Sequence, residues 1–179
     1  YTTVTILADK EEIGSYGNTG LSSDFVLHYL EDLASLEGAN IRTLLRNTTA
    51  LSSDVNGAFD PTFASVYEER NSCFVNKGPC LTKYTGARGK SGSNDASAET
   101  MAKIISIMDE AKVYWQIGEL GAVDEGGGGT VALYVAAMDV DVVDLGVPVL
   151  CMHSPFELTS KLDVYYTYKA FAAFLASDK

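Results

Sequence analysis

The sequence contains few cysteines, and they are not spaced as structural cysteines usually are. Cys73, Cys80 and Cys151 make three in 179 residues, an odd number with no C-x-x-C pair. A disulfide framework needs paired cysteines, and a zinc knuckle needs closely spaced ones. Neither is therefore expected, and this cysteine usage favours a reducing, cytoplasmic compartment.

Basic residues and long apolar runs are also scarce. The 13 Lys and Arg residues are outnumbered by 24 Asp and Glu residues, which gives a formal net charge of −11. An acidic surface repels nucleic acid phosphates and anionic lipid head groups. No apolar run approaches the roughly 20 residues that a membrane-spanning helix needs. We therefore expect no nucleic acid partner and no membrane association.

The apolar content is that of a globular domain. Hydrophobic residues make up 46% of the chain. At this length a single domain buries roughly two-thirds of the surface that its unfolded chain exposes, without disulfide support. The chain opens at Tyr1 without an initiating Met. We expect it to be a piece of a longer polypeptide.

Hydrophobic spacing alternates along the chain between the strand period and the helix period. Strands are expected at 2–8, 48–53, 80–84, 113–117, 140–145 and 147–151. Helices are expected from Ser22 or Ser23 to Glu37, at Leu44 and Leu45, from Asn94 or Asp95 to Ala111, from Thr130 to Met138 and from Glu157 to Ala176. Loops are expected at 9–20 and through most of 61–93. This order predicts an α/β fold with a mixed, largely parallel sheet flanked by helices.

Two of these helices carry an apolar stripe. The stripe of the helix that ends at Glu37 holds Phe25, Tyr29, Leu33 and Leu36. That of the helix that ends at Ala111 holds Met101, Ile104, Ile105 and Met108. Side chains at this spacing share one face of a helix, and we expect the second stripe to be buried.

Four charged or imidazole side chains follow predicted strands. Glu11 and Glu12 come after 2–8, Asp54 after 48–53 and His153 after 147–151. Strand ends are where α/β sheets usually carry their sites, and this ligand set suits divalent metals, with zinc favoured by the histidine. The alternatives are a solvated acidic turn, a capping aspartate and a hydrogen-bonded histidine. The other histidine, His28, lies inside a predicted helix, and we interpret it as structural.

A run of four glycines precedes the predicted helix at Thr130. Gly126, Gly127, Gly128 and Gly129 let backbone approach a ligand closely and expose the amides of a helix N-terminus. The run is no phosphate loop, because the G-K-[ST] ending is missing. It is either a wall of a substrate site or a flexible connector.

Five strings of residues carry a family resemblance. The strings are ADKEEIGS, LSSDVNGAFDP, KYTGARGKSGSNDASAE, GELGAVDEGGGGT and DLGVPVLCMHSPFELTSKLDVYYTYKAF. In this order they resemble the aminopeptidase I family of co-catalytic dizinc metallopeptidases, which includes aspartyl aminopeptidases. The likeness is closest to bacterial members, since eukaryotic ones usually carry a histidine within the stretch that is Asn56 to Phe59 here.

The resemblance implies a role for each candidate. Glu11 corresponds to the family's general base, and Glu12, Asp54 and His153 correspond to ligands of two zinc ions per active site. The implied reaction removes N-terminal residues from short peptides, with water activated by zinc and deprotonated by glutamate. The family also forms large homo-oligomers, commonly dodecamers.

The family pattern further needs an upstream histidine ligand and a bridging aspartate, and neither has a counterpart in this sequence. Residues 1–179 are therefore expected to form the C-terminal portion of a zinc aminopeptidase catalytic domain, inactive alone. The alternative is a non-catalytic interaction or assembly module on a peptidase scaffold.

Overall fold

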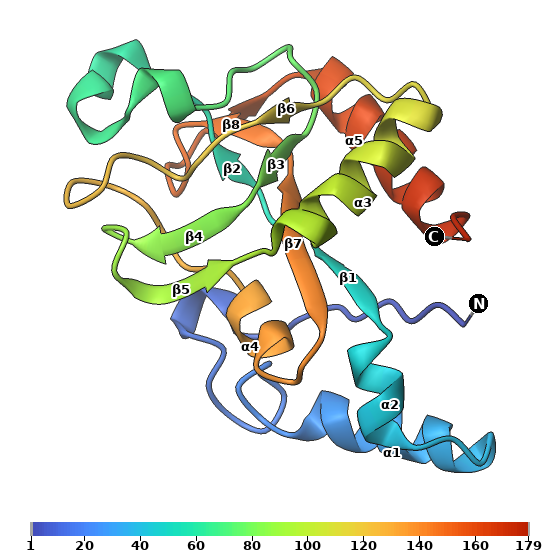
Figure 1. The fold of residues 1–179 in the computed structure, drawn as a ribbon. Helices are drawn as coiled ribbons and strands as arrows, with labels where there is room; N and C mark the ends of the chain where they lie inside the picture. The colour runs from blue at the N-terminus through green and yellow to red at the C-terminus, as the bar shows by residue number, and fades with distance from the viewer. Residues whose placement is uncertain (1, 179) are drawn as a thin grey trace.

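A computed structural model describes residues 2–178 and shows strands and helices alternating along the chain (Figure 1). The α-helices are α1 Phe25–Leu36, α2 Ile41–Arg46, α3 Ala98–Glu110, α4 Ala132–Ala136 and α5 Lys161–Leu175. The strands are β1 Thr49–Ser52, β2 Asn56–Gly57, β3 Cys80–Thr82, β4 Tyr84–Ala87, β5 Ser91–Asp95, β6 Gln116–Ile117, β7 Asp141–Gly146, β8 Pro148–Leu150 and β9 Leu158–Thr159. Short 3-10 helices lie at η1 Glu11–Ile13, η2 Pro61–Val66 and η3 Glu69–Asn71.

The sheets mix parallel and antiparallel pairs. The largest has the order β1-β7-β3-β6, in which β7 runs parallel to β1 and antiparallel to β3, and β6 runs parallel to β3. A smaller sheet, β2-β8-β9, continues from the ends of β1 and β7, and β4 and β5 form a hairpin. The predicted α/β class with a mixed sheet flanked by helices is confirmed.

The main core lies between the largest sheet and the helices α3 and α5. Its buried side chains are Leu81, Ala96, Met101, Ile104, Ile107, Met108, Val113, Val143, Leu145 and Ala170. The expected stripe of α3 is buried here through Met101, Ile104 and Met108, with Ile105 partly buried against them. Among residues 2–178, no helix combines the length and apolarity that crossing a membrane requires.

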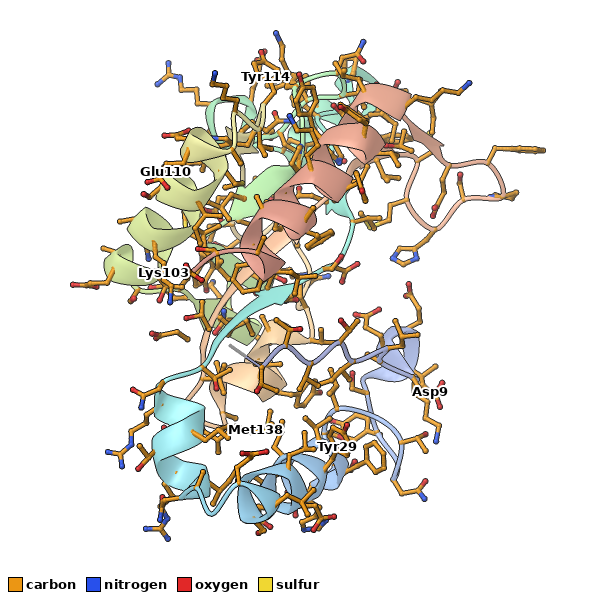
Figure 2. The ribbon with its side chains drawn as sticks, turned by 90° about the vertical axis from the view of Figure 1, so that its right-hand side faces the viewer. Asp9, Tyr29, Lys103, Glu110, Tyr114 and Met138 are labelled. Carbon is orange, nitrogen blue, oxygen red and sulfur yellow. The ribbon has the colours of Figure 1, made fainter. Side chains whose placement is uncertain are left out.

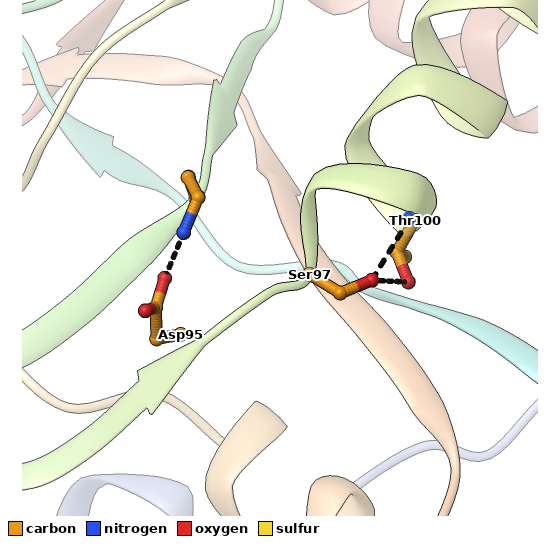
Figure 3. A network of polar contacts seen from close by, with 4 residues as sticks. Asp95, Ser97 and Thr100 are labelled. Atoms are coloured by element: carbon orange, nitrogen blue, oxygen red, sulfur yellow. Dashed lines mark hydrogen bonds and ion pairs between the residues drawn. The ribbon is translucent and has the colours of Figure 1, made fainter.

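The start of α3 differs from the prediction because a strand that was not predicted, β5, occupies the residues just before it. β5 extends to Asp95, whose carboxylate pairs with Lys83 next to it on the hairpin (Figure 3). The N-cap is Ser97, whose hydroxyl accepts a hydrogen bond from the Thr100 amide at 3.0 Å (Figure 3). A serine side chain satisfies one of the free amides of the first turn, which fixes the helix start here.

One prediction about the N-terminal third is wrong. Residues 2–8 form no strand: Ile6 and Leu7 are 44% and 92% exposed, and no strand among residues 2–178 pairs with them. Threonine and valine favour strands only where a neighbour supplies hydrogen bonds and packing. The Phe25 and Tyr29 face of α1 is exposed, whereas Val26 and Ala34 are buried. Figure 2 shows α1 and α2, with labelled Tyr29 and Met138 nearby, in the half of the molecule away from α3 and α5.

Candidate metal centre

The two adjacent glutamates lie on a short turn whose backbone is fixed on both sides. Glu11 and Glu12 begin η1, between Lys10 at φ 62° and Gly14 at φ 85°. The Gly14 amide donates to the Glu11 carbonyl at 2.9 Å and closes the turn. Asp9, labelled in Figure 2 beside this turn, bridges to Gly20. The loop predicted for 9–20 is therefore an ordered turn that holds both carboxylates.

Asp54 follows β1 at the edge of the sheet. Its Oδ1 accepts a hydrogen bond from the Val55 amide at 2.7 Å. A Cβ at Gly146, the last residue of β7, would lie only 1.8 Å from the Asp54 carbonyl oxygen. Glycine at 146 thus allows the chain after β1 to pass close to the end of β7. This contact sets the backbone position of Asp54.

His153 lies in the turn that joins β8 to β9. Its backbone has φ 66°, and its amide donates to Glu157 Oε1 at 2.6 Å. Its Nδ1 lies 3.7 Å from Glu12 Oε2, and the two side chains are 65% and 74% exposed. An ion pair as exposed as this adds little to folding stability. The pair matters because it brings together two side chains that lie 141 positions apart in the sequence.

Glu11 and Asp54 lie close enough to Glu12 and His153 for the charges of that pair to shift their pKa values. The pKa of Glu11 is raised by partial burial and by the charges of Asp54 and Glu12, and His153 opposes the rise. The pKa of Asp54 is raised by burial and by Glu12, whereas its bond from Val55 and the charge of His153 lower it. The four predicted residues thus act on one another at a site that gathers negative charge.

The donor set suits zinc, although it does not form a complete site. Carboxylate oxygen and imidazole nitrogen are both common zinc ligands. Within residues 2–178, however, no group of three His, Cys, Asp or Glu side chains is arranged closely enough to hold a metal ion. Glu12 and His153 are the predicted ligands that lie within ion-pairing distance.

A further carboxylate near the site, Asp144 of β7, was missed by the sequence analysis. It is 5% exposed, and Ser52 of β1 and Thr82 of β3 are its neighbours in the sheet. Neither of its oxygens makes a hydrogen bond of normal geometry within the described chain. Burial raises its pKa to about 6; the hydroxyls of Ser52 and Thr130 lower it, and Asp54 raises it. The available signal was an acid in the middle of a mostly apolar strand.

The raised pKa of Asp144 predicts that stability rises as pH falls. The folded chain binds this proton more tightly than the unfolded chain, so the carboxylate destabilises the fold at pH 7 and ceases to do so below pH 4. The free energy of unfolding should increase by on the order of 3 kcal/mol as the pH falls from about 6 to about 4. Urea unfolding of wild type and Asp144→Asn at pH 7 and pH 5 measures it. The free energies of unfolding of the two proteins should differ more at pH 7 than at pH 5. An identical difference at the two pH values contradicts the prediction.

Most of the glycine run is explained by backbone packing. A Cβ at Gly126 would lie 2.6 Å from the Val66 carbonyl oxygen, and one at Gly127 would lie 2.5 Å from the Gly86 carbonyl oxygen. A Cβ at Gly129 would lie 2.9 Å from the carbonyl oxygen of Gly92. Glycine at these positions lets the run pass against the β4–β5 hairpin and the end of η2. The loop is therefore packed, not a loose connector.

The run offers a matched pair of stability variants. Gly127→Ala should lower the free energy of unfolding by about 1–3 kcal/mol, because φ is 100° there and the new methyl group meets a carbonyl oxygen. Gly128→Ala should change it by less than about 1 kcal/mol, since nothing lies within 4 Å of its Cβ position. Chemical denaturation of the two variants makes the comparison. Equal losses would show that the run is not held by these contacts.

Glu11 and the end of the glycine run share a pocket of about 150 Å³. Gly129 and Thr130 form one side of it, and Gly14 and Ser15 of the η1 loop form another. Gly92 of β5 and Leu133 and Tyr134 of α4 complete the lining. Of the four candidate glycines, Gly129 is the one that this lining contains within the described chain.

Three comparisons agree on the same relatives. A family profile described as aminopeptidase I zinc metalloprotease (M18) matches residues 1–175. The "Probable M18 family aminopeptidase 1" of Clostridium acetobutylicum is 48% identical over 178 residues, which are 97% of this chain and 38% of that protein. The crystal structure of the M18 family aminopeptidase of Thermotoga maritima superposes with a TM-score of 0.88 at 43% identity, covering 94% of this chain and 38% of that one.

A more distant structure shares the fold alone. The S. cerevisiae mApe1 dodecamer has a TM-score of 0.76 at 24% identity, covering 94% of this chain and 36% of that one. The present chain thus spans well under half the length of the relatives it matches. Over nearly all of its own length it follows the profile, the sequence and the fold of one group of enzymes. The chain belongs to the aminopeptidase I zinc metalloprotease (M18) family.

Proposed function

We propose that residues 1–179 are the C-terminal portion of the catalytic domain of a zinc aminopeptidase, which removes N-terminal residues from peptides. Family membership supports the activity. The observation that carries the assignment to this chain is the meeting of Glu12 with His153 beside Glu11 and Asp54. Charges of like sign gathered in this way favour a bound cation.

Glu12, Asp54 and His153 are the proposed zinc ligands, in a site that binds two ions in the complete protein. The described residues supply three donors of the right chemistry without a closed group of three. The proposal draws the remaining ligands, a histidine and a bridging aspartate, from elsewhere in the parent polypeptide. Bound zinc supplies Lewis acidity, which polarises the scissile carbonyl and lowers the pKa of water.

Glu11 is the proposed general base. Its carboxylate accepts the proton of the attacking water and then delivers it to the nitrogen of the leaving amine. The raised pKa of Glu11 suits this role, because a base whose pKa lies closer to the working pH can also return the proton. Its position in the pocket with Gly129 places it beside the proposed substrate wall formed by the glycine run.

The proposed partners are short peptide substrates and further copies of the same protein, in a large homo-oligomer. The yeast dodecamer supports a twelve-subunit assembly as the form to test. A cytoplasmic location is also proposed, supported by three free cysteines of which Cys73 and Cys80 are fully buried.

A comparison of two proteins tests the proposed function. The full-length polypeptide that carries these residues should bind zinc and hydrolyse leucyl-anilide, whereas residues 1–179 alone should bind zinc weakly and hydrolyse no anilide. Metal analysis and a chromogenic assay on both proteins measure this. A full-length protein that binds no zinc and cleaves nothing would support the alternative, a non-catalytic assembly module on a peptidase scaffold.

A further inference from the structure

We propose that Asn56 is a positioning residue for the metal centre, whose buried side chain ties β2 to β3 and so sets the place of Asp54 relative to His153. The inference rests on the proposed function, in which Asp54 and His153 are zinc ligands, and it adds a residue that acts through Asp54. Asn56 lies two positions after Asp54 and is 3% exposed. An amide side chain is rarely buried to this extent unless its polar atoms have partners.

Both polar atoms of the Asn56 side chain have partners on other segments. Nδ2 donates a hydrogen bond to Thr82 Oγ1 of β3 at 2.6 Å, and Oδ1 accepts one from the Cys73 thiol at 3.3 Å. Thr82 and Cys73 are themselves fully buried. Because these groups are shielded from solvent, a bond lost here leaves its partner unsatisfied. The two bonds therefore hold the amide of Asn56, and with it β2, against β3.

The strand that contains Asn56 connects the two proposed ligands. β2 runs parallel to β8, and the Asn56 amide donates to the Val147 carbonyl at 2.9 Å. One residue separates Asp54 from β2, and the turn that carries His153 follows β8. The pairing of β2 with β8 thus fixes where Asp54 lies relative to His153, as long as β2 keeps its place.

β2 is too short for its backbone pairing to hold it firmly. Its two residues pair with Pro148 and Val149, and the Ala58 amide adds a bond to the Val149 carbonyl at 2.9 Å. By contrast, β1 pairs with β7 over four residues before the chain reaches Asp54. The side chain of Asn56 supplies the additional anchor, since it links β2 to a strand of the largest sheet.

The zinc affinity of the full-length polypeptide, measured by chelator competition, tests the proposal. Asn56→Ala should weaken zinc binding by about 10–100-fold, the cost typical of altering a residue that supports a metal ligand. Thr82→Val keeps the shape of threonine but removes the hydroxyl that accepts the bond from Asn56, so it should weaken binding to a similar degree. Thr82→Ser keeps the hydroxyl and should weaken binding by less than about tenfold.

A buried threonine elsewhere in the chain separates positioning from general stability. The hydroxyl of Thr167 on α5 donates to the Asp163 carbonyl of the same helix at 2.8 Å. Thr167→Val removes a buried hydroxyl as Thr82→Val does, but it should leave the zinc affinity unchanged. Urea unfolding of each variant shows how far any loss of zinc affinity follows a loss of stability.

The possible failures are distinguishable. A wild type that binds no zinc contradicts the proposed function. If wild type binds zinc and Thr82→Val binds it equally tightly, the positioning role of Asn56 is overturned. Equal weakening in Thr82→Val and Thr82→Ser, or in Thr82→Val and Thr167→Val, also overturns it. If Asn56→Ala does not fold, the two Thr82 variants decide alone.

Discussion

Replacement of Glu11 by Gln in the full-length polypeptide should lower kcat for leucyl-anilide by about 10²–10⁴-fold and leave the zinc content unchanged. Glutamine has nearly the shape of glutamate but accepts no proton at neutral pH. Glu11 begins η1, and the closing hydrogen bond of that turn uses its backbone carbonyl, so the turn survives the change. Steady-state kinetics together with metal analysis separate a lost base from a lost ligand.

Glu12, the residue next to Glu11 in sequence, provides a comparison for this prediction. Glu12→Gln should lower the zinc content as well as the rate, because Glu12 faces His153 Nδ1 and is a proposed ligand. Glu31→Gln on the exposed surface of α1 is the control and should change neither quantity. Undiminished activity in Glu11→Gln would remove this residue as the base. Loss of zinc in the same variant would make it a ligand instead.

The parts of the fold that sequence reasoning predicted are those whose burial gives a periodic pattern. The helix α3 was predicted because its stripe lies against the main core, and β7 because both of its faces are covered. The hairpin of β4 and β5 was missed, since four of the nine residues in YTGA and SGSND are glycine or serine, which carry little strand signal. It forms because its two strands pair with each other and its backbone packs on the glycine run.

Some residues of the candidate site were predictable from the sequence, and others were not. Glu12, Asp54 and His153 were found because a polar side chain that follows an apolar strand is visible in one sequence. Asp144 was missed since it sits within such a run, and Tyr134 since its contact with Gly14 joins residues 120 positions apart. Long-range contacts of this kind leave no local pattern. Their discovery requires the topology that brings α4 against the η1 loop.

Part of the chain's excess of acidic residues is concentrated at the candidate site. The charges of Asp54 and Glu12 raise the pKa of Glu11, that of Glu12 raises the pKa of Asp54, and that of Asp54 raises the pKa of Asp144. Gathering carboxylates in this way costs folding free energy, and a cation that binds the folded chain offsets that cost by mass action. This gathering of carboxylates is what the proposed metal-binding role requires.

The second large expected effect is on zinc binding, with His153 as the proposed ligand and His28 as its control. His153→Ala should weaken zinc binding by roughly 100-fold or more, because loss of a ligand should exceed the 10–100-fold cost typical of altering an outer-shell partner. His28→Ala is the matched control, since His28 lies exposed on α1, and it should leave zinc affinity unchanged. Chelator competition on the full-length polypeptide and its two variants measures the affinities.

A third variant separates the imidazole from the turn that carries it. Glu157→Gln retains a side-chain oxygen that can accept the bond from the His153 amide, so it should preserve the turn and weaken zinc binding by less than about tenfold. If His153→Ala and His28→Ala weaken zinc binding equally, His153 is not a ligand. If Glu157→Gln weakens binding as much as His153→Ala does, the site depends on the backbone of this turn, not on the imidazole alone.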